Sequence, residues 1–246
     1  MLAYTRFEIT RTFRNVRYLA ISLGLPVLLY LLFNQIYSKA GSPGGVGTYF
    51  LVGMACFSMI TSAISANGGT LPAERTGGWL RQLRTTPLSG TGFIVAKVVL
   101  ATAVVIPGLA AVSLAAILVG HVDMSIAQWA GFIALVLAGS IPFGFIGLLI
   151  GQLLDTQSAQ PVQGILSMLL SFGGGLFFPM SLFPDALQSV ARVLPTHLLF
   201  AIGQNLVSKQ LADLSDVAGL AAWAVGLGAV ALALWFQQGA RRLATA

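Results

Sequence analysis

Long apolar runs separated by short polar segments dominate this sequence of 246 residues, and they constrain its fold more than any motif does. Hydrophobic residues make up 57% of the chain and charged residues only 8%, whereas about a quarter of the residues in a typical globular domain are charged. A helix that spans a membrane needs about 20 apolar residues, so this length accommodates about six spans with short connections. The sequence therefore predicts an all-α membrane protein.

We expect six transmembrane helices in a single domain that covers residues 1–246. Their approximate ranges are 18–37, 48–69, 93–120, 126–152, 162–178 and 217–236. The segment 153–163 is expected to be an inner loop that is not basic. Between the last two spans the chain is too polar and too rich in proline to cross a membrane cleanly. We expect two short re-entrant helices there, 185–192 and 195–207, which dip into the outer leaflet, the second with Leu198, Leu199 and Ile202 on a shared side.

The N-terminal segment 1–17 is basic and predicts an amphipathic helix ahead of the first span. One side of this helix is apolar: Leu2, Ile9, Phe13 and Val16. The other side is charged: Glu8, Arg11 and Arg14. Such a helix is typical of one that lies on the cytoplasmic surface of a membrane. A basic flank without a defined shape is the alternative interpretation.

A polar segment, 70–97, separates the second span from the third. Its basic excess is typical of a cytoplasmic loop, and its charged residues are Glu74, Arg75, Arg81, Arg84 and Lys97. Pro72 suits the first turn of a short helix, and Pro87 would end it. Gly77-Gly78 weakens that helix and would mark a kink or the close approach of another backbone.

This short helix has two distinct faces. Trp79, Leu80 and Leu83 share an apolar face, whereas Arg81 and Arg84 lie on a basic one with Thr85. The pattern predicts a short amphipathic helix held near the membrane with its basic face turned to the cytoplasm. A solvated loop that clamps lipid is the alternative.

The distribution of basic residues predicts the orientation of the chain. With both termini in the cytoplasm, ten of the thirteen basic residues lie on the cytoplasmic side, and Lys39, Arg192 and Lys209 lie outside. The opposite orientation would reverse this bias, which runs against the positive-inside rule. The same rule explains the net charge of +6, so we expect no nucleic-acid partner.

The sequence carries no motif for catalysis or for phosphate binding. Cys56 is the one cysteine, and His121 and His197 lack a carboxylate spacing that would make either a ligand or a base. No ionisable residue is expected at mid-membrane, which disfavours an ion-coupled carrier. Gly147 and Gly151 are spaced for close helix contact.

Taken together, these features resemble the ABC-2 type permeases of ATP-driven exporters. The segment 73–97 carries the Glu, the Gly, the Leu-x-x-Leu spacing and the Thr-Pro-Leu of that family, here Glu74, Gly77 or Gly78, Leu80 with Leu83, and Thr86-Pro87-Leu88. The segment 177–199 is similar to the family's outer segment, with the recurring prolines Pro179, Pro184 and Pro195.

The resemblance implies a permease without an ATPase site of its own, paired as a homodimer or heterodimer and embedded in the lipid of the inner (cytoplasmic) membrane. This chain would bind no cofactor, and ATP and Mg would bind a separate ATP-binding subunit. The segment after the second span would be the coupling helix, with contributions from Glu74, Arg75, Trp79, Leu80, Arg81, Leu83 and Arg84. The N-terminal helix would be a connecting element, with Ile9, Arg11, Phe13 and Arg14.

The cargo implied by the resemblance is hydrophobic or amphipathic: a drug, an antibiotic or a lipid-like molecule. An ion-coupled secondary transporter of small molecules is the main alternative. An intramembrane enzyme and a passive membrane anchor for a partner complex are two further alternatives.

Overall fold

The computed structural model describes residues 2–14, 16–39, 46–78 and 89–243, and the regular structure in these ranges is helical. The longest helices are α2 (Val16–Lys39), α3 (Val46–Gly68), α6 (Gly90–Leu118), α7 (Ile126–Leu153), α8 (Thr156–Gly173) and α11 (Leu214–Leu243). The shorter ones are α1 (Leu2–Phe13), α4 (Leu71–Thr76), α9 (Asp185–Ala191) and α10 (Pro195–Val207), with a 3₁₀ turn at Met180–Leu182. The prediction of an all-α fold is confirmed for these residues.

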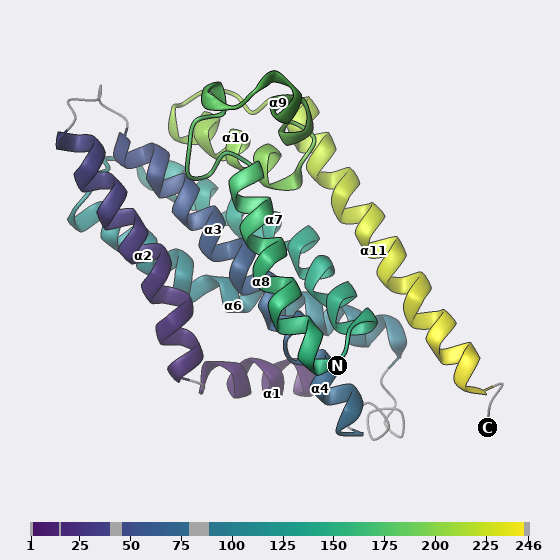
Figure 1. Cartoon of the computed structure of the whole chain (residues 1–246). Helices are drawn as coiled ribbons and strands as arrows, with labels where there is room; N and C mark the ends of the chain where they lie inside the picture. Colours follow the sequence, from purple (N-terminus) through teal and green to yellow (C-terminus); the bar gives the residue numbers. More distant parts are fainter. Residues whose placement is uncertain (1, 15, 40–45, 79–88, 244–246) are drawn as a thin grey trace.

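Helix α3 lies at the centre of the bundle, in contact with α2, α6, α7, α8 and α10 (Figure 1). Every residue from Phe50 to Ile60 is buried, because this stretch is apolar or small on all sides. Small side chains also let α7 approach α3 closely. A Cβ added to Gly147 would meet the backbone of Ile64, and one added to Gly151 would lie 2.9 Å from the carbonyl oxygen of Asn67. The close helix contact predicted at these two glycines is confirmed.

Four helical segments are long and apolar enough to cross a membrane, among the residues that the structure describes: Gly47–Thr76, Gly90–Leu118, Ile126–Leu153 and Leu214–Gln237. They coincide with the predicted second, third, fourth and sixth spans. The pair α9 and α10, bent by 83°, would raise the number to five if it were counted as one span. Helices α2 and α8 occupy the positions of the predicted first and fifth spans, so the number of six spans stays a prediction.

Helix α8 begins earlier than the sequence suggested. The inner loop predicted at 153–163 is wrong in its extent, because α7 ends at Leu153 and α8 already begins at Thr156. Asp155 caps the new helix by accepting hydrogen bonds from the backbone N–H groups of Gln157 and Ser158. The backbone N–H and the side chain of Ser158, together with the Gln157 N–H, hold the pKa of the Asp155 carboxyl below its usual range.

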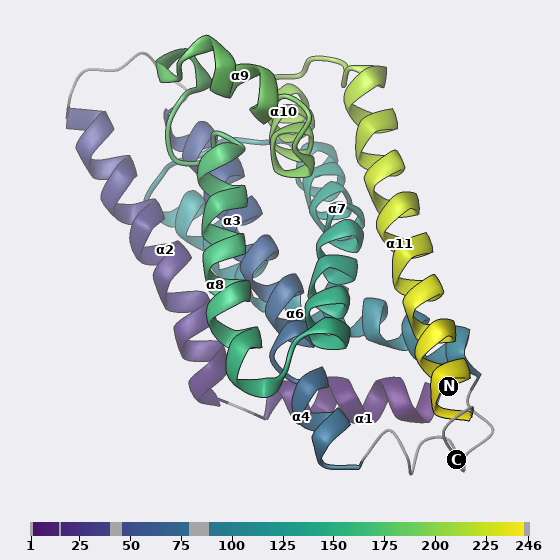
Figure 2. The same cartoon turned by 45° about the vertical axis from the view of Figure 1, so that its right-hand side comes forward.

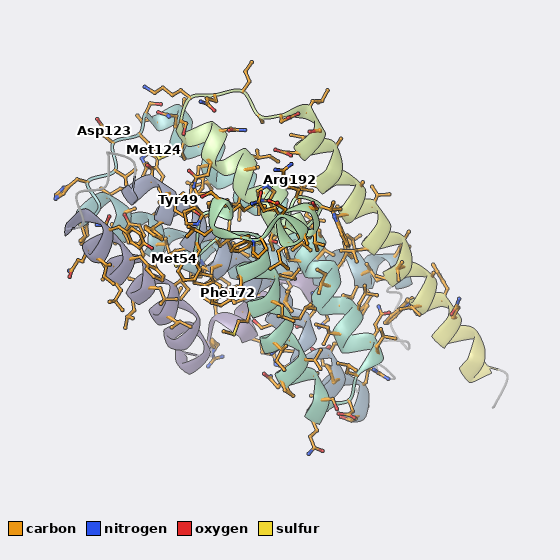
Figure 3. All side chains as sticks on the ribbon, turned by 45° about the horizontal axis from the view of Figure 1, so that its top comes forward. Tyr49, Met54, Asp123, Met124, Phe172 and Arg192 are labelled. Carbon is orange, nitrogen blue, oxygen red and sulfur yellow. The ribbon has the colours of Figure 1, made fainter. Side chains whose placement is uncertain are left out.

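Helices α9 and α10 close one end of the bundle (Figures 1 and 3). Both were predicted from the sequence, and both are confirmed as helices at the expected positions. The predicted shared side of α10 is buried, since Leu198, Leu199 and Ile202 all lie in the core. Trp223 of α11 donates a hydrogen bond to the Val193 carbonyl, which ties this end of the bundle to the outermost helix.

Candidate functional site at the base of the bundle

The end of the bundle opposite α9 and α10, here called the base, carries α1 and α4. Helix α1 lies across the base at a steep angle to the long helices and contacts α6 (Figure 2). Helix α4 continues from α3 through Gly69 and Thr70 and contacts α7 and α8. The C-terminal end of α11 lies at the base as well. The base therefore gathers the N-terminal helix and the described beginning of the segment 70–97, both of which the sequence predicts to be cytoplasmic.

The helix predicted from Pro72 to Thr86 is interrupted after its first six residues. Helix α4 ends at Thr76, where Gly77 caps it and Gly78 takes a φ of +75°, a conformation that glycine adopts readily. The predicted break at the two glycines is therefore real. The remaining predicted site residues, Trp79, Leu80, Arg81, Leu83 and Arg84, lie outside the described residues, and their role stays a prediction.

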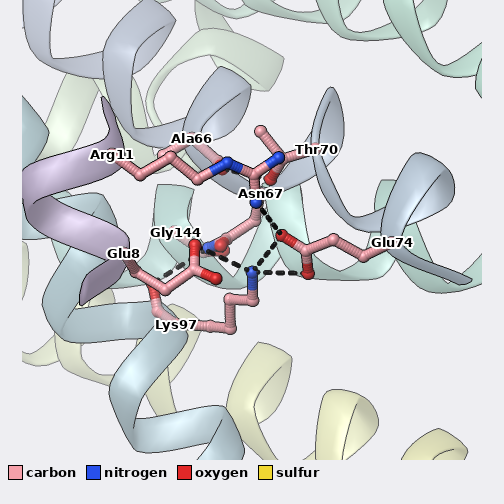
Figure 4. A network of polar contacts seen from close by, with 8 residues as sticks. All are labelled: Glu8, Arg11, Ala66, Asn67, Thr70, Glu74, Lys97 and Gly144. Carbon is pink, nitrogen blue, oxygen red and sulfur yellow. Dashed lines mark hydrogen bonds and ion pairs between the residues drawn. The ribbon is translucent and has the colours of Figure 1, made fainter. Parts of the chain in front are cut away.

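A buried ion cluster connects α1, α4 and α6 at the base (Figure 4). The ammonium of Lys97, from α6, lies 2.8 and 3.0 Å from the two carboxylate oxygens of Glu74, from α4. It also lies 3.5 Å from Oε2 of Glu8, from α1. Arg11 of α1 places Nη1 3.8 Å from Glu74 Oε1. We call these residues, Glu8, Arg11, Glu74 and Lys97, the base cluster.

Burial makes the base cluster unusual for a set of ionised side chains. The side chain of Lys97 is 0% exposed, those of Glu8 and Glu74 are each 4% exposed, and only Arg11, at 57%, reaches the surface. An isolated buried charge is very costly, but two acidic and two basic groups in contact balance one another. The arrangement holds three helices together through charges that compensate one another.

One expectation from the sequence is wrong at this cluster. Glu8 was expected on the exposed charged side of the N-terminal helix, yet it is buried against Lys97. Glu8 turns inward because its partner lies almost ninety positions along the chain and leaves no trace in the local pattern. On the predicted apolar side, Phe13 is exposed and Ile9 is half-buried, and the contact of that side with lipid stays a prediction.

Sequence reasoning also counted Lys97 among the loop charges, although one signal could have shown its burial. Lys97 is the one charged residue between Phe93 and Gly120, in a run predicted to span the membrane. A charge inside a span almost always has a partner inside the protein. That rule would have directed attention to an acidic residue at the same end of the bundle, and Glu74 fulfils it.

Neighbouring groups support the base cluster. Asn67 of α3, fully buried, donates hydrogen bonds to the carbonyl oxygens of Lys97, at 3.1 Å, and Gly144, at 3.5 Å, so it connects α3 with α6 and α7. The ring of Phe93 lies 5.6 Å from the Lys97 ammonium and stacks on Trp235 of α11, with 4.5 Å between ring centroids. The backbone around the cluster is thus fixed from several sides.

Arg75, next to Glu74 in the chain, anchors α4 to a different helix. Its Nη1 donates to the carbonyl oxygens of Gln152, Gly151 and Leu154, at 2.6, 3.1 and 3.3 Å. These carbonyls belong to the C-terminal end of α7, where backbone oxygens lack helical partners and the helix dipole favours a cation. Two adjacent residues of opposite charge therefore fasten α4 to α6 and to α7.

A cleft with a volume of about 610 Å³ opens between α2, α3 and α8. At its far end the lining is aromatic: Phe33, Phe57, Phe172, Phe177 and Phe178. Nearer the base the lining is polar but uncharged: Thr61, Ser65, Gln163 and Ser167. Gln163 accepts no hydrogen bond at its buried Oε1, although its amide nitrogen donates to Gln160. The cleft can hold a molecule that is apolar at one end and polar but uncharged at the other.

The described residues form no metal site, because no three of their His, Cys, Asp or Glu side chains lie close enough together to hold an ion. The arrangement offers mechanical connection at the base and a neutral cavity between the long helices.

Comparison with known proteins agrees with this architecture. The family model described as ABC-2 family transporter protein matches residues 35–236, which is most of the chain. A protein of Bacillus subtilis (strain 168) named "Putative transport permease YvfS" is 27% identical over 191 residues, a stretch that covers 77% of this chain and 78% of that protein. The extent of the family match, together with the helical bundle and its spans, shows that the chain belongs to the ABC-2 family of transporter membrane proteins.

Proposed function

We propose that this chain is the permease subunit of an ATP-driven exporter, which moves a hydrophobic or amphipathic substrate out across the cytoplasmic membrane. ABC-2 permease domains typically lack ATPase activity, and the family in general works with an ATP-binding partner subunit. ATP and Mg would bind that partner. The observation that carries the proposal is the fastening of α4 by Glu74 and Arg75 to α6 and α7, directly before the segment that resembles a coupling helix.

The base attaches that segment to the spanning helices through α4. A coupling segment transmits motion only if its own attachment to the spanning helices does not yield. Glu74 and Arg75 bind within this chain, so we propose that they hold the segment, while Trp79, Leu80 and Leu83 anchor it in a groove of the ATP-binding subunit. In this proposal Arg81 and Arg84 pair with acidic residues at the rim of that groove, and the basic end of the bundle faces the cytoplasm.

The cleft supports a cargo without a net charge. Its described lining is aromatic and aliphatic at one end and carries hydroxyl and amide groups at the other, and it includes no Asp, Glu, Lys or Arg. A charged cargo would lose its hydration there without gaining a counter-ion. We therefore propose an uncharged amphipathic substrate, which enters from the membrane or the cytoplasm.

The same lining argues against the ion-coupled alternative. A coupled carrier needs an ionisable group on the path of its substrate. In the described part of the chain the buried charges lie at the base, not in the cleft, and Lys97 is already matched by two carboxylates.

The homodimer or heterodimer that the family resemblance implies remains part of the proposal.

Association with an ATPase is the first test. We expect the detergent-solubilised wild-type chain to co-purify with an ATP-binding subunit and its ATPase activity, and the Leu83→Asp variant to lose both. Leu211→Asp serves as the matched control, since this leucine is 95% exposed at the opposite end of the bundle. Mass spectrometry identifies the partner. A well-folded wild type without any ATPase would overturn the exporter proposal.

Filling the cleft tests the cargo. Gly164 lines the cleft, and a Cβ added there meets nothing within 4 Å, so Gly164→Phe should fold normally and occupy the cavity. We expect ATP-dependent uptake of the neutral dye Nile red into inside-out vesicles to fall to background, with the ATPase still bound. Gly226→Phe on α11, a position that is equally open, should transport as the wild type does. Unchanged uptake in the Gly164→Phe variant would place the cargo elsewhere.

A further inference from the structure

We infer that Lys97 and Glu8 are positioning residues that fasten α1 to α4, so that a displacement of α4 also moves α1 and, through it, α2. The inference rests on the proposed function for the event that displaces α4, namely the closure of the ATP-binding subunits. Through this ionic connection a movement of α4 reaches α1 and then α2, although α2 and α4 are far apart along the chain.

Ion pairs connect α1 with α4 by two routes that meet at the carboxylate of Glu74. The first route runs from Glu8 through the Lys97 ammonium, with contacts of 3.5 and 2.8 Å. The second is the direct pair between Arg11 and Glu74 at 3.8 Å. The first route is enclosed by protein, so water and salt screen it much less than a surface pair. The second is exposed at Arg11 and is correspondingly weak.

The positions of the cleft walls show why this connection matters. Helix α3 forms one wall and continues directly into α4 through Gly69 and Thr70, so a movement of α4 reaches it along the backbone. Helix α2 forms a second wall with Leu25, Pro26, Leu29 and Phe33. Along the chain α2 is far from α4, but it follows α1 directly. The base cluster therefore provides a short route from α4 to the second wall.

The shared ammonium makes this route cooperative. An ammonium has three N–H donors, and here it serves one carboxylate from α4 and one from α1. If α4 moved without α1, one of the two buried carboxylates would be separated from its cation in a region of low dielectric. Moving both helices together avoids that cost. Coupling through packed and ionic contacts is established only by measuring it, so the test measures relative motion.

Distances between spin labels on α1 and α4 test the fastening in the chain alone. Cys56, the one cysteine, is replaced by alanine, and cysteines are introduced at the exposed positions Thr10 and Ala73 for labelling. In lipid nanodiscs we expect one narrow distribution of the distance between the two labels, measured by pulsed electron–electron double resonance. Glu8→Gln should broaden it, because the neutral amide no longer holds the ammonium. Lys97 itself stays unchanged in this series, because its loss would leave two buried carboxylates without their shared cation.

Two variants control this measurement. Arg6→Gln removes a charge from the same helix at an exposed position outside the base cluster and should leave the distribution narrow. Glu8→Asp keeps the charge and should restore most of the narrow distribution, an outcome that simple loss of packing would not produce. A Glu8→Gln distribution as narrow as that of the wild type would overturn the inference.

The consequence for transport is measured in the complex with the co-purified ATP-binding subunit. We expect Glu8→Gln to keep ATP hydrolysis near the wild-type rate while the amount of Nile red moved per phosphate released falls. An unchanged amount of Nile red moved per phosphate released would overturn the role of the base cluster in coupling ATP hydrolysis to transport. If neither the wild type nor the variants co-purify with an ATPase, the proposed function fails. The spin-label experiment on the chain alone still decides whether Lys97 and Glu8 fasten α1 to α4.

Discussion

Replacing Lys97 with methionine is expected to lower the free energy of unfolding by about 3–5 kcal/mol, the usual cost of removing one partner from a buried ion pair. The substitution leaves the carboxylates of Glu8 and Glu74 inside the protein without the ammonium that they share. Arg11 offers only a long contact from the surface and replaces little of the loss. The measurement is thermal denaturation in detergent, followed by tryptophan fluorescence and by size-exclusion chromatography of the heated sample.

Removing the two acidic partners as well distinguishes the effect of charge on stability from the effect of packing. Adding Glu8→Gln and Glu74→Gln to Lys97→Met should raise the stability above that of Lys97→Met alone, because the uncompensated charges disappear. If packing were decisive, each further substitution would lower stability instead. Lys209→Met, at an exposed lysine of the opposite end, is the matched control and should have little effect. Equal melting temperatures for Lys97→Met and Lys209→Met would contradict the prediction.

Replacing Gly147 with alanine is expected to cost about 3 kcal/mol, at the upper end of the range for overpacked interiors. The new Cβ would meet the Ile64 backbone of α3, which cannot move aside as a flexible side chain can. Since α3 is the central helix, any separation of α7 from α3 also loosens its contacts with α6 and α8. We expect a lower melting temperature and a smaller yield of monodisperse protein.

Gly226→Ala is the control for this substitution. It makes the same chemical change in a long helix, but an added Cβ meets nothing within 4 Å there. Because alanine favours helices more than glycine does, we expect it to be neutral or to stabilise the protein by up to about 1 kcal/mol. If both glycine variants behaved alike, the close approach of α3 and α7 would not contribute to stability.

Much of the fold could be predicted from residues that are close in sequence. Apolar runs of sufficient length predicted the segments around α3, α6, α7 and α11, and the spacing of Leu198, Leu199 and Ile202 predicted the buried side of α10. These signals are reliable because helix periodicity and span length are local properties. The break at Gly77-Gly78 was visible for the same reason, as backbone freedom belongs to the residue itself.

The start of α8 could not be judged from local polarity. Its first turns are rich in glutamine and contain Pro161, which favoured a loop, yet Asp155 caps a helix that packs against α3 and α7. Tertiary contact outweighed a weak local preference at this point. Arg75 is a similar case, since its three carbonyl partners belong to residues 76 to 79 positions away.

The class of the protein and the positions of its main helices follow from hydropathy and spacing along the chain, and its family from the match of residues 35–236. The packing of α1, α4 and α6, by contrast, turns Glu8 inward, buries Lys97 and brings Glu74 to both. Lys97 and Glu74 are 23 positions apart, and Glu8 lies farther still. A charge becomes favourable in the interior only when its counter-charge is folded against it, and that meeting is a property of packing rather than of any single segment.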